Sequence, residues 1–231
     1  SINSTVSANT TSGFSIVSWT ATGSPHTIGH GLGSTPAVII LKNRDTAKDY
    51  MVYHHKMSST PERDYLNLNT TAVIGTHTTW NNTAPTSSVF SFGSWSGNAS
   101  GNKIVAYCFT DVQGFSKMGS YTGNGSASSG TFIYTGQKSA FIMIKRTDTS
   151  GSWEMYDAKR EGFNPQVHGL TANTYNAEDN TDDLLDLLSN GFKLYHDGGG
   201  LNASGGNYIF MAFAEAPLVG GTGGGVPCTA R

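Results

Sequence analysis

Apolar residues in this chain occur in short runs that are separated by polar turns. The runs are rich in β-branched and aromatic residues, and the segments between them are rich in Gly, Ser, Thr, Asn and Asp. Such runs between turn residues are typical of β-strands. The clearest predicted strands are 13–20, 36–42, 50–53, 89–92, 103–111, 114–122, 139–145, 153–156, 191–194 and 207–215. Many short strands with frequent turns predict an all-β fold of the sandwich or barrel type.

One stretch of the pattern occurs twice. The turn sequence Asn-Ala-Ser-Gly at 98–101 precedes the apolar run 103–111, and 104 positions later the same turn at 202–205 precedes the run 207–215. Asn, Ser and Gly favour turns because they tolerate left-handed backbone or bond their own main chain. Each following run is apolar at nearly every position, which predicts an inner strand that is buried on both faces.

Other predicted strands repeat at nearly the same spacing. The run 36–42 matches 139–145 and Tyr50 matches Trp153, with all offsets falling between 101 and 104. One-residue insertions in loops produce a drift of this size. We therefore predict an internal duplication that gives two tandem antiparallel β-sandwich repeats of a jelly-roll-like kind. The predicted organisation is a lead-in segment at 1–12, repeat 1 at 13–112, repeat 2 at 113–216 and a Gly-rich C-terminal tail at 217–231.

The two repeats differ most between their middle and late strands. Repeat 2 has acidic residues before leucines at a spacing of three to four, and Ser189-Asn190-Gly191 closes the segment. This pattern predicts a helix of one to two turns over 182–188, the only helix expected in the chain. The acidic residues would then favour the helix N-terminus. Calcium binding is the alternative interpretation, but the spacing departs from that of an EF-hand loop.

Composition narrows the range of functions. The chain has 37% hydrophobic and only 13% charged residues, and its net charge is −2. It offers no basic stripe for nucleic acid, and no apolar run approaches the roughly 20 residues needed to cross a bilayer. We expect neither nucleic-acid binding nor membrane insertion. Because the chain begins at Ser1 without a visible signal peptide, we interpret it as part of a longer protein or as a processed product.

The sequence contains no recognisable catalytic or cofactor motif. The Gly-rich stretch 29–33 is not followed by a helix signal, so it predicts a turn and no phosphate site. His54 and His55 would point to opposite faces of a strand, which argues against a shared metal. Cys108 and Cys228 match no metal or disulfide framework and are both expected to be free. We predict a protein that is not an enzyme and has no metal or cofactor.

Aromatic residues inside polar loops are the best candidates for ligand binding. A ring supplies contact area for a sugar, and neighbouring amides supply direction. In an alternative interpretation, Trp80 and Tyr175 anchor equivalent ends of the two cores, because each follows Thr and precedes Asn. Trp95 lies among glycines and has no aromatic counterpart in repeat 2, so it is the stronger candidate. The predicted ligand-binding residues are Trp80, Asn81, Asn82, Trp95, Tyr175 and Asn176.

Several segments together resemble a known family. The segments 13–20, 27–33, 80–86 and 115–125 are similar to a repeat domain from the C-terminal part of many marine bacteriophage tail-fibre-like and virion surface proteins. The end of the chain, 226–231, also resembles the natural ends of those proteins. The resemblance covers nearly the whole chain and implies a structural protein of the virion surface that binds a receptor. It supplies no catalytic residues.

These observations predict a non-enzymatic module of a tail fibre or spike that binds host cell-surface glycans. Weak single sites would be multiplied by several copies per particle, which favours a homo-oligomer, expected to be a trimer, attached to other virion proteins. One alternative is a purely structural capsid decoration protein or filament subunit. Another is a glycan depolymerase whose acid pair is assembled by the fold, since sequence does not reveal how carboxylates pair across a sandwich.

Overall fold

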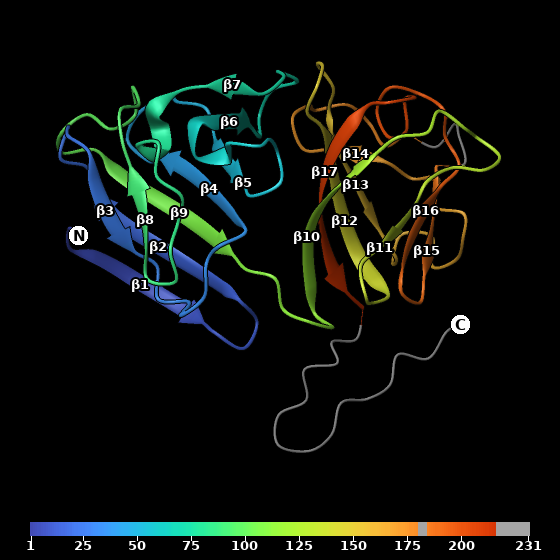
Figure 1. Cartoon of the computed structure of the whole chain (residues 1–231), viewed down its shortest axis with the longest axis horizontal. Coiled ribbons are helices and arrows are strands. Elements are labelled where there is room, and N and C mark those ends of the chain that lie inside the picture. Colours follow the sequence, from blue (N-terminus) through green and yellow to red (C-terminus); the bar gives the residue numbers. More distant parts are fainter. Residues whose placement is uncertain (180–183, 216–231) are drawn as a thin grey trace. The chain divides into compact units, whose positions relative to one another are not determined.

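The computed structural model describes residues 1–179 and 184–215. The chain divides into two compact units, unit 1 (Ser1–Asp111) and unit 2 (Val112–Arg231), whose strands are labelled in Figure 1. Both units consist of antiparallel β-sheets, so the prediction of an all-β, sandwich-like fold is confirmed. No helix among the described residues is long and apolar enough to span a membrane.

Unit 1 contains one large and one small sheet. Hydrogen bonds join the large sheet in the order β1-β2-β9-β4-β5-β6-β7, and β3 pairs with β8 in the small sheet. The strands are β1 (Ser4–Asn9), β2 (Phe14–Thr20), β3 (His26–Gly29), β4 (Val38–Asn43), β5 (Met51–His54), β6 (Asp64–Asn67), β7 (Gly75–Thr76), β8 (Val89–Phe92) and β9 (Lys103–Phe109). Two short 3-10 helices, Pro61–Arg63 and Thr78–Trp80, lie between strands.

Unit 2 has a five-stranded sheet, β10-β17-β12-β13-β14, and a three-stranded sheet, β11-β16-β15. The strands are β10 (Ser116–Thr122), β11 (Phe132–Tyr134), β12 (Ser139–Arg146), β13 (Trp153–Asp157), β14 (Leu170–Thr171), β15 (Leu185–Leu188), β16 (Gly191–Leu194) and β17 (Asn207–Ala214). The order β2-β9-β4-β5-β6 in unit 1 is therefore the order β10-β17-β12-β13-β14 in unit 2.

Matching hydrogen bonds extend this correspondence to single residues. The backbone N–H of Tyr50 donates to Asn69 Oδ1 at 2.9 Å, and that of Trp153 donates to Asn173 Oδ1 at 2.8 Å. The Asp45 carboxylate accepts from the backbone of Lys103. In unit 2 the Asp148 carboxylate accepts from the backbone of Asn207. The two units thus share a strand order and local contacts. A duplication would explain both, and it stays a prediction.

Each core lies between the large and the small sheet of its unit. In unit 1, Trp19 on β2 meets Phe90 and Phe92 on β8 edge-on, with ring centroids 5.8 and 5.5 Å apart. In unit 2, Phe192 on β16 meets Phe210 on β17 at 5.5 Å. Rings that interlock in this way bury large apolar areas and fix the distance between two sheets.

The two repeated strands differ in burial. Along β17, buried side chains follow one another from Tyr208 to Ala212, as predicted for an inner strand. Along β9, burial alternates, with Ile104, Ala106 and Cys108 buried and the residues between them half-buried or exposed. Phe109 is also only half-buried. The prediction of burial on both faces is therefore wrong for β9. Apolar residues show that a strand can be buried, but they do not show whether another part of the chain packs against each face.

Two predicted segments have another structure than expected. The lead-in segment contains β1, which pairs along its whole length with β2 and extends the large sheet. The predicted helix is wrong over Leu185–Leu188, which form β15 and pair with β16 through a hairpin whose loop is Ser189-Asn190. Leu185 and Leu187 are buried on one face, so the spacing of two decides the structure. The preceding residues 182–183 and the tail from 216, including Cys228, lie outside the described residues.

Candidate functional site

Trp80 is a core residue. Its side chain is 1% exposed, its indole N–H donates to the backbone oxygen of Asp64 at 2.9 Å, and its ring meets Tyr53 edge-on at 5.5 Å. Asn81 and Asn82 are exposed and have left-handed backbone, with φ of 52° and 50°, where Asn is among the few tolerated residues. The alternative interpretation as a core anchor thus fits Trp80, and its buried ring cannot stack on a ligand.

Tyr175 does not occupy the place that Trp80 has in unit 1. Its side chain is fully exposed, as is Asn176, whose backbone N–H donates to Thr174 Oγ1 at 3.3 Å. The expected equivalence of the two aromatic residues is therefore wrong. Neither Tyr175 nor Asn176 lines the pocket at Trp95 or the other two pockets described below.

Trp95 lines a pocket of about 350 Å³ at one end of unit 1. The loop between β8 and β9 carries this residue, and the turn after β2 forms the opposite wall with Gly23 and Pro25. The half-buried ring meets Phe92 edge-on at 5.9 Å and lies so close to Gly97 that a side chain there would clash with it. The core and the glycine thus hold the ring in place.

Asn98 stands in the same pocket wall and is 5% exposed. Its amide nitrogen donates to the backbone oxygens of Gly93 at 2.8 Å and Ser24 at 3.3 Å. These two acceptors fix the orientation of the amide, so Asn98 Oδ1 is the free end. Within the described part of the chain, this oxygen is buried and has no hydrogen-bond partner. A buried acceptor without a partner is costly, and water or a ligand normally satisfies it.

His26, which does not line the pocket, has a second such atom and contacts the same backbone oxygen as Asn98. Its Nδ1 lies 2.7 Å from the backbone oxygen of Ser24, the oxygen that Asn98 also contacts. Because a carbonyl only accepts, Nδ1 carries the proton and Nε2 of the neutral ring is an acceptor. Among the described residues, Nε2 is buried and unpartnered. Of these two residues only Asn98 lines the pocket, where a hydroxyl group or an ordered water molecule would complete its hydrogen bonds.

In unit 2 the side-chain oxygen of the corresponding asparagine has hydrogen-bond partners. Asn202 Oδ1 accepts from the backbone N–H of Asn124 at 3.0 Å and from the Thr131 hydroxyl at 3.1 Å. Its amide nitrogen donates to the backbone oxygen of Ser126 at 3.2 Å, as Asn98 does to Ser24. The same turn therefore has a fully hydrogen-bonded asparagine in unit 2 and an asparagine with an unpartnered Oδ1 in unit 1. The unpartnered oxygen is thus a feature of unit 1.

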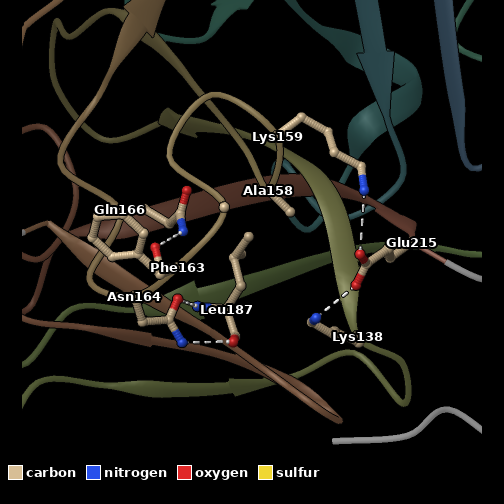
Figure 2. A pocket seen from close by; sticks show the side chains of 9 residues that line it. Lys138, Ala158, Lys159, Phe163, Asn164, Gln166, Leu187 and Glu215 are labelled. Atoms are coloured by element: carbon tan, nitrogen blue, oxygen red, sulfur yellow. Dashed lines mark hydrogen bonds and ion pairs between the residues drawn. The ribbon is translucent and has the colours of Figure 1, made fainter. Parts of the chain in front are cut away.

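A second pocket, of about 390 Å³, lies in unit 2. Figure 2 shows Phe163, Asn164 and Leu187 on one side of it, and Lys138, Lys159 and Glu215 on the other. The Phe163 side chain is 70% exposed. It belongs to the loop after β13, directly after Gly162, whose φ is 78°.

Asn164 fastens this loop to the edge of β15. Its Oδ1 accepts from the backbone N–H of Leu187 at 3.0 Å, and its amide nitrogen donates to the Leu187 oxygen at 2.9 Å. Gln166 continues the pairing, because its backbone N–H donates to the Leu185 oxygen at 2.7 Å. The loop thus covers an edge strand that would otherwise present open hydrogen-bonding groups. It also holds Phe163 at the pocket.

The charged wall of this pocket contains two cations and one anion. Lys138 Nζ lies 2.6 Å from Glu215, and Lys159 Nζ lies 3.4 Å from the other oxygen of that carboxylate. The hydrogen bond from Lys138 is the largest cause of the lowered pKa of Glu215, and Lys159 adds to it. Glu215 is therefore held as a carboxylate, so it suits binding of hydroxyl or ammonium groups better than proton donation.

The sequence signal that selected Trp95 also applies to Phe163. Phe163 lies between Gly162 and Asn164-Pro165, an aromatic residue in a turn-rich segment, but it was not among the predicted binding residues. The charged trio gives no comparable signal, since Lys138, Lys159 and Glu215 are far apart in the sequence. Only the pairing of β12 with β13 and β17 brings them together.

The histidines and acids show no metal centre in the described part of the chain, where no group of three or more His, Cys, Asp or Glu residues could hold an ion. His30 uses both ring nitrogens inside the protein, with Nε2 at 3.1 Å from the Thr86 oxygen and Nδ1 accepting from Leu32 N at 3.3 Å. Cys108 is free and buried, as predicted, and burial raises the pKa of its thiol to about 12.

The fold and these pockets define an all-β protein of two sandwich-like units with aromatic residues in loop pockets. Residues 1–217 match the family described as Domain of unknown function (DUF7483), and the chain belongs to this family. Searches among curated proteins and among solved structures find no match.

Proposed function

We propose that this protein is a non-enzymatic module that binds carbohydrate, with the Trp95 pocket as its principal site. The observation that carries the proposal is the combination of a fixed, half-buried indole with the unpartnered acceptor Asn98 Oδ1, whose residue lines the same pocket. Sugars present an apolar C–H face and a rim of hydroxyl donors. The apolar face of a sugar would stack on the Trp95 ring, and one of its hydroxyl groups would donate a hydrogen bond to the unpartnered acceptor beside the ring.

The low charge of the chain supports a neutral ligand at this pocket. Its wall consists of Gly23, Pro25, Ser94, Ser96 and neighbouring backbone, with no charged side chain. Hydroxyl groups of Ser94 and Ser96 both donate and accept, as a carbohydrate does. The Phe163 pocket in unit 2 would be a second site, where Lys159 and Glu215 add charged partners to an exposed ring.

The biological setting is proposed from the sequence resemblance. We place the module at the distal part of a bacteriophage tail fibre or spike, outside the cell and on the virion surface, where it would bind host surface glycans. Shallow single sites bind weakly, and several copies raise the overall affinity through effective concentration. This argument favours a homotrimer joined to other virion proteins. Light scattering over a range of concentrations would detect it, and a monomer at all concentrations would contradict it.

A glycan array probed with the fluorescently labelled protein tests the function. We expect binding to a subset of neutral glycans, weakened at least about fivefold by Trp95→Ala, which removes about 1–3 kcal/mol of ring contact. Tyr175→Ala is the matched control, since it removes an exposed ring outside the pockets, and it should bind as the wild type does.

The other outcomes decide between the alternatives. Failure to bind any glycan would contradict the proposal and favour a purely structural decoration or filament protein. Release of reducing ends from a polysaccharide would contradict the non-enzymatic part and favour a depolymerase. Equal loss in the Trp95→Ala and Tyr175→Ala variants would show that binding, if present, occurs elsewhere.

A further inference from the structure

A third pocket lies on the outer face of the large sheet in unit 1 and has a different chemistry. Its volume is about 320 Å³, and it is lined by side chains of β1, β2 and the ends of β4 and β9. Val17, Trp19 and Ile104 point into the core, so the alternate residues of these strands lie on the outer face. The outer-face residues that line the pocket are Asn3, Thr5, Ser18, Thr20, Arg44 and Lys103.

Strand register brings these residues together. Thr5 is opposite Ser18 in the β1–β2 pair, and Thr20 is opposite Lys103 in the β2–β9 pair. Arg44 extends the β4–β9 ladder by one step, because its backbone N–H donates to the Lys103 oxygen at 2.8 Å. Directly opposed residues on one face have neighbouring side chains. Two cations and several hydroxyl groups therefore share one small surface.

The two cations have no carboxylate partner among the described residues. The nearest carboxylate with a defined contact is that of Asp45, which accepts from the backbone N–H of Lys103 at 2.7 Å and makes no ion pair with either cation. Arg44, Lys103 and Asp45 are all exposed. The pocket thus keeps a net positive charge in a chain whose overall charge is −2.

Unit 2 lacks each of these features. Asn207 is opposite Thr122 as Lys103 is opposite Thr20, and the backbone N–H of Thr147 donates to the Asn207 oxygen at 2.9 Å. Asn207 and Thr147 therefore occupy the positions of Lys103 and Arg44. Among the described strands, β10 is the edge of its sheet, so unit 2 has no counterpart of β1. The cations and the extra strand occur together in unit 1 only.

We infer that this surface of unit 1 is a binding site for acidic polysaccharide, with Arg44 and Lys103 holding a sulfate or carboxylate group and Asn3, Thr5, Ser18 and Thr20 contacting sugar hydroxyls. Arg and Lys bind such oxyanions through charge-assisted hydrogen bonds, and Arg does so with two parallel N–H groups. Hydroxyl and amide groups beside the cations suit a ligand that carries hydroxyls as well as charge.

The site lies at the same end of unit 1 as the Trp95 pocket. The Asn43 amide nitrogen, one residue before Arg44, donates at 2.8 Å to the oxygen of Gly97 in the Trp95 loop. That loop leads into Lys103. The inference goes beyond the proposed function, because it gives unit 1 a separate site for acidic polysaccharides on residues that the Trp95 pocket does not use.

Three dextrans with one backbone test the inference: neutral dextran, dextran sulfate and carboxymethyl dextran. Surface plasmon resonance with the full chain should show binding to at least one acidic dextran and at least tenfold weaker binding to neutral dextran at low salt. The acidic arm that binds more tightly identifies sulfate or carboxylate as the preferred group. Affinity should fall with added salt, because exposed charges are screened.

The variant Arg44→Thr/Lys103→Asn introduces the residues that unit 2 has at these positions. It should lower affinity for the acidic dextran about tenfold or more, since two charged hydrogen-bonding groups are lost. Lys56→Asn/Arg63→Thr removes the same charge from exposed sites of unit 1 outside the pocket and should leave affinity within about twofold. Circular dichroism on both variants shows whether they fold.

Equal weakening by the two double variants would overturn the site, because it would show attraction by net charge alone. Absence of binding to either acidic dextran, or tighter binding to polyphosphate of similar length, would overturn the ligand class. Trp95→Ala should retain the preference for acidic over neutral dextran. A failure of glycan binding at the Trp95 pocket is therefore distinguishable from a failure of this site.

Discussion

Trp80, Trp95 and Tyr175 differ in what surrounds each ring. Trp80 is enclosed and hydrogen-bonded, Trp95 is half-buried in a pocket wall, and Tyr175 is fully exposed and lines none of the three pockets described. In the sequence all three stand among Ser, Thr, Asn and Gly, and that composition describes the loop but not the body against which the loop packs. Residue type alone therefore identified candidates, and tertiary packing separated a core anchor from a residue that lines a pocket.

Trp80→Ala should destabilise unit 1 by about 3–5 kcal/mol, because it leaves a large cavity and removes the partner of the Asp64 oxygen. Tyr175→Ala should change stability by less than about 0.5 kcal/mol, since no packing is lost. Denaturant midpoints measured by tryptophan fluorescence and circular dichroism provide the comparison. Similar losses in the two variants would mean that the burial assigned to these rings is wrong.

The Cys108 thiol should make stability depend on pH in the alkaline range. Burial raises its pKa to about 12 from an ordinary value of 9. Between these values the native thiol keeps a proton that the unfolded thiol has lost. Stability therefore falls as pH rises through this window. Cys108→Ala should show a shallower fall from pH 9 upward, and buried tyrosines such as Tyr53 contribute equally to both proteins. Parallel stability curves for wild type and variant would contradict the assignment.

At the scale of elements, the sequence pattern indicated where strands form but not what packs against them. The apolar runs at β4, β9, β12 and β17 correctly indicated strands, since β-branched and aromatic residues gather there between turns. The leucines before Ser189 fitted a spacing of three to four as well as a spacing of two, and the partner strand β16 decides for the latter. β1 was missed because Ser, Thr, Ala and Asn in an exposed edge strand resemble a linker.

Asn164→Ala should destabilise unit 2 by about 1–3 kcal/mol. The change leaves the backbone N–H and oxygen of Leu187 without the side chain that completes the edge of β15. Asn176→Ala is the matched control, an exposed asparagine whose side chain makes no such pair, and it should be nearly neutral. Hydrogen exchange at Leu187 N–H should accelerate in the first variant only. Unchanged protection there would contradict the role of Asn164 as an edge cap.

At the scale of the whole chain, the repeat was visible because turns recur as well as hydrophobic runs. The Asn-Ala-Ser-Gly turns identified β9 and β17 as corresponding strands before any contact was known. The pockets were not predictable in the same way. The Phe163 pocket joins the loop after β13, Leu187 on β15 and the residues just before β12 and just after β17, and the cationic surface of unit 1 needs the register of four strands. Side chains that are distant in sequence meet only through this register.

The two units share their order of strands but differ in their open hydrogen-bonding groups. Asn202 Oδ1 accepts hydrogen bonds, whereas Asn98 Oδ1 has no hydrogen-bond partner among the described residues. The cations of unit 1, Arg44 and Lys103, are replaced by Thr147 and Asn207 in unit 2. Two units with the same strand order thus carry different surfaces. The central claim is that the unpartnered Asn98 Oδ1 of unit 1 belongs to a carbohydrate site at Trp95.

Nuclear magnetic resonance of the indole N–H groups tests this claim most directly. The chain has four tryptophans, and three of them, Trp19, Trp80 and Trp153, are buried. Titration with a neutral glycan selected from the array should shift the Trp95 signal progressively and leave those of Trp19, Trp80 and Trp153 almost unchanged. A glycan that binds while the Trp95 signal stays fixed, or that shifts a different indole instead, would contradict the account.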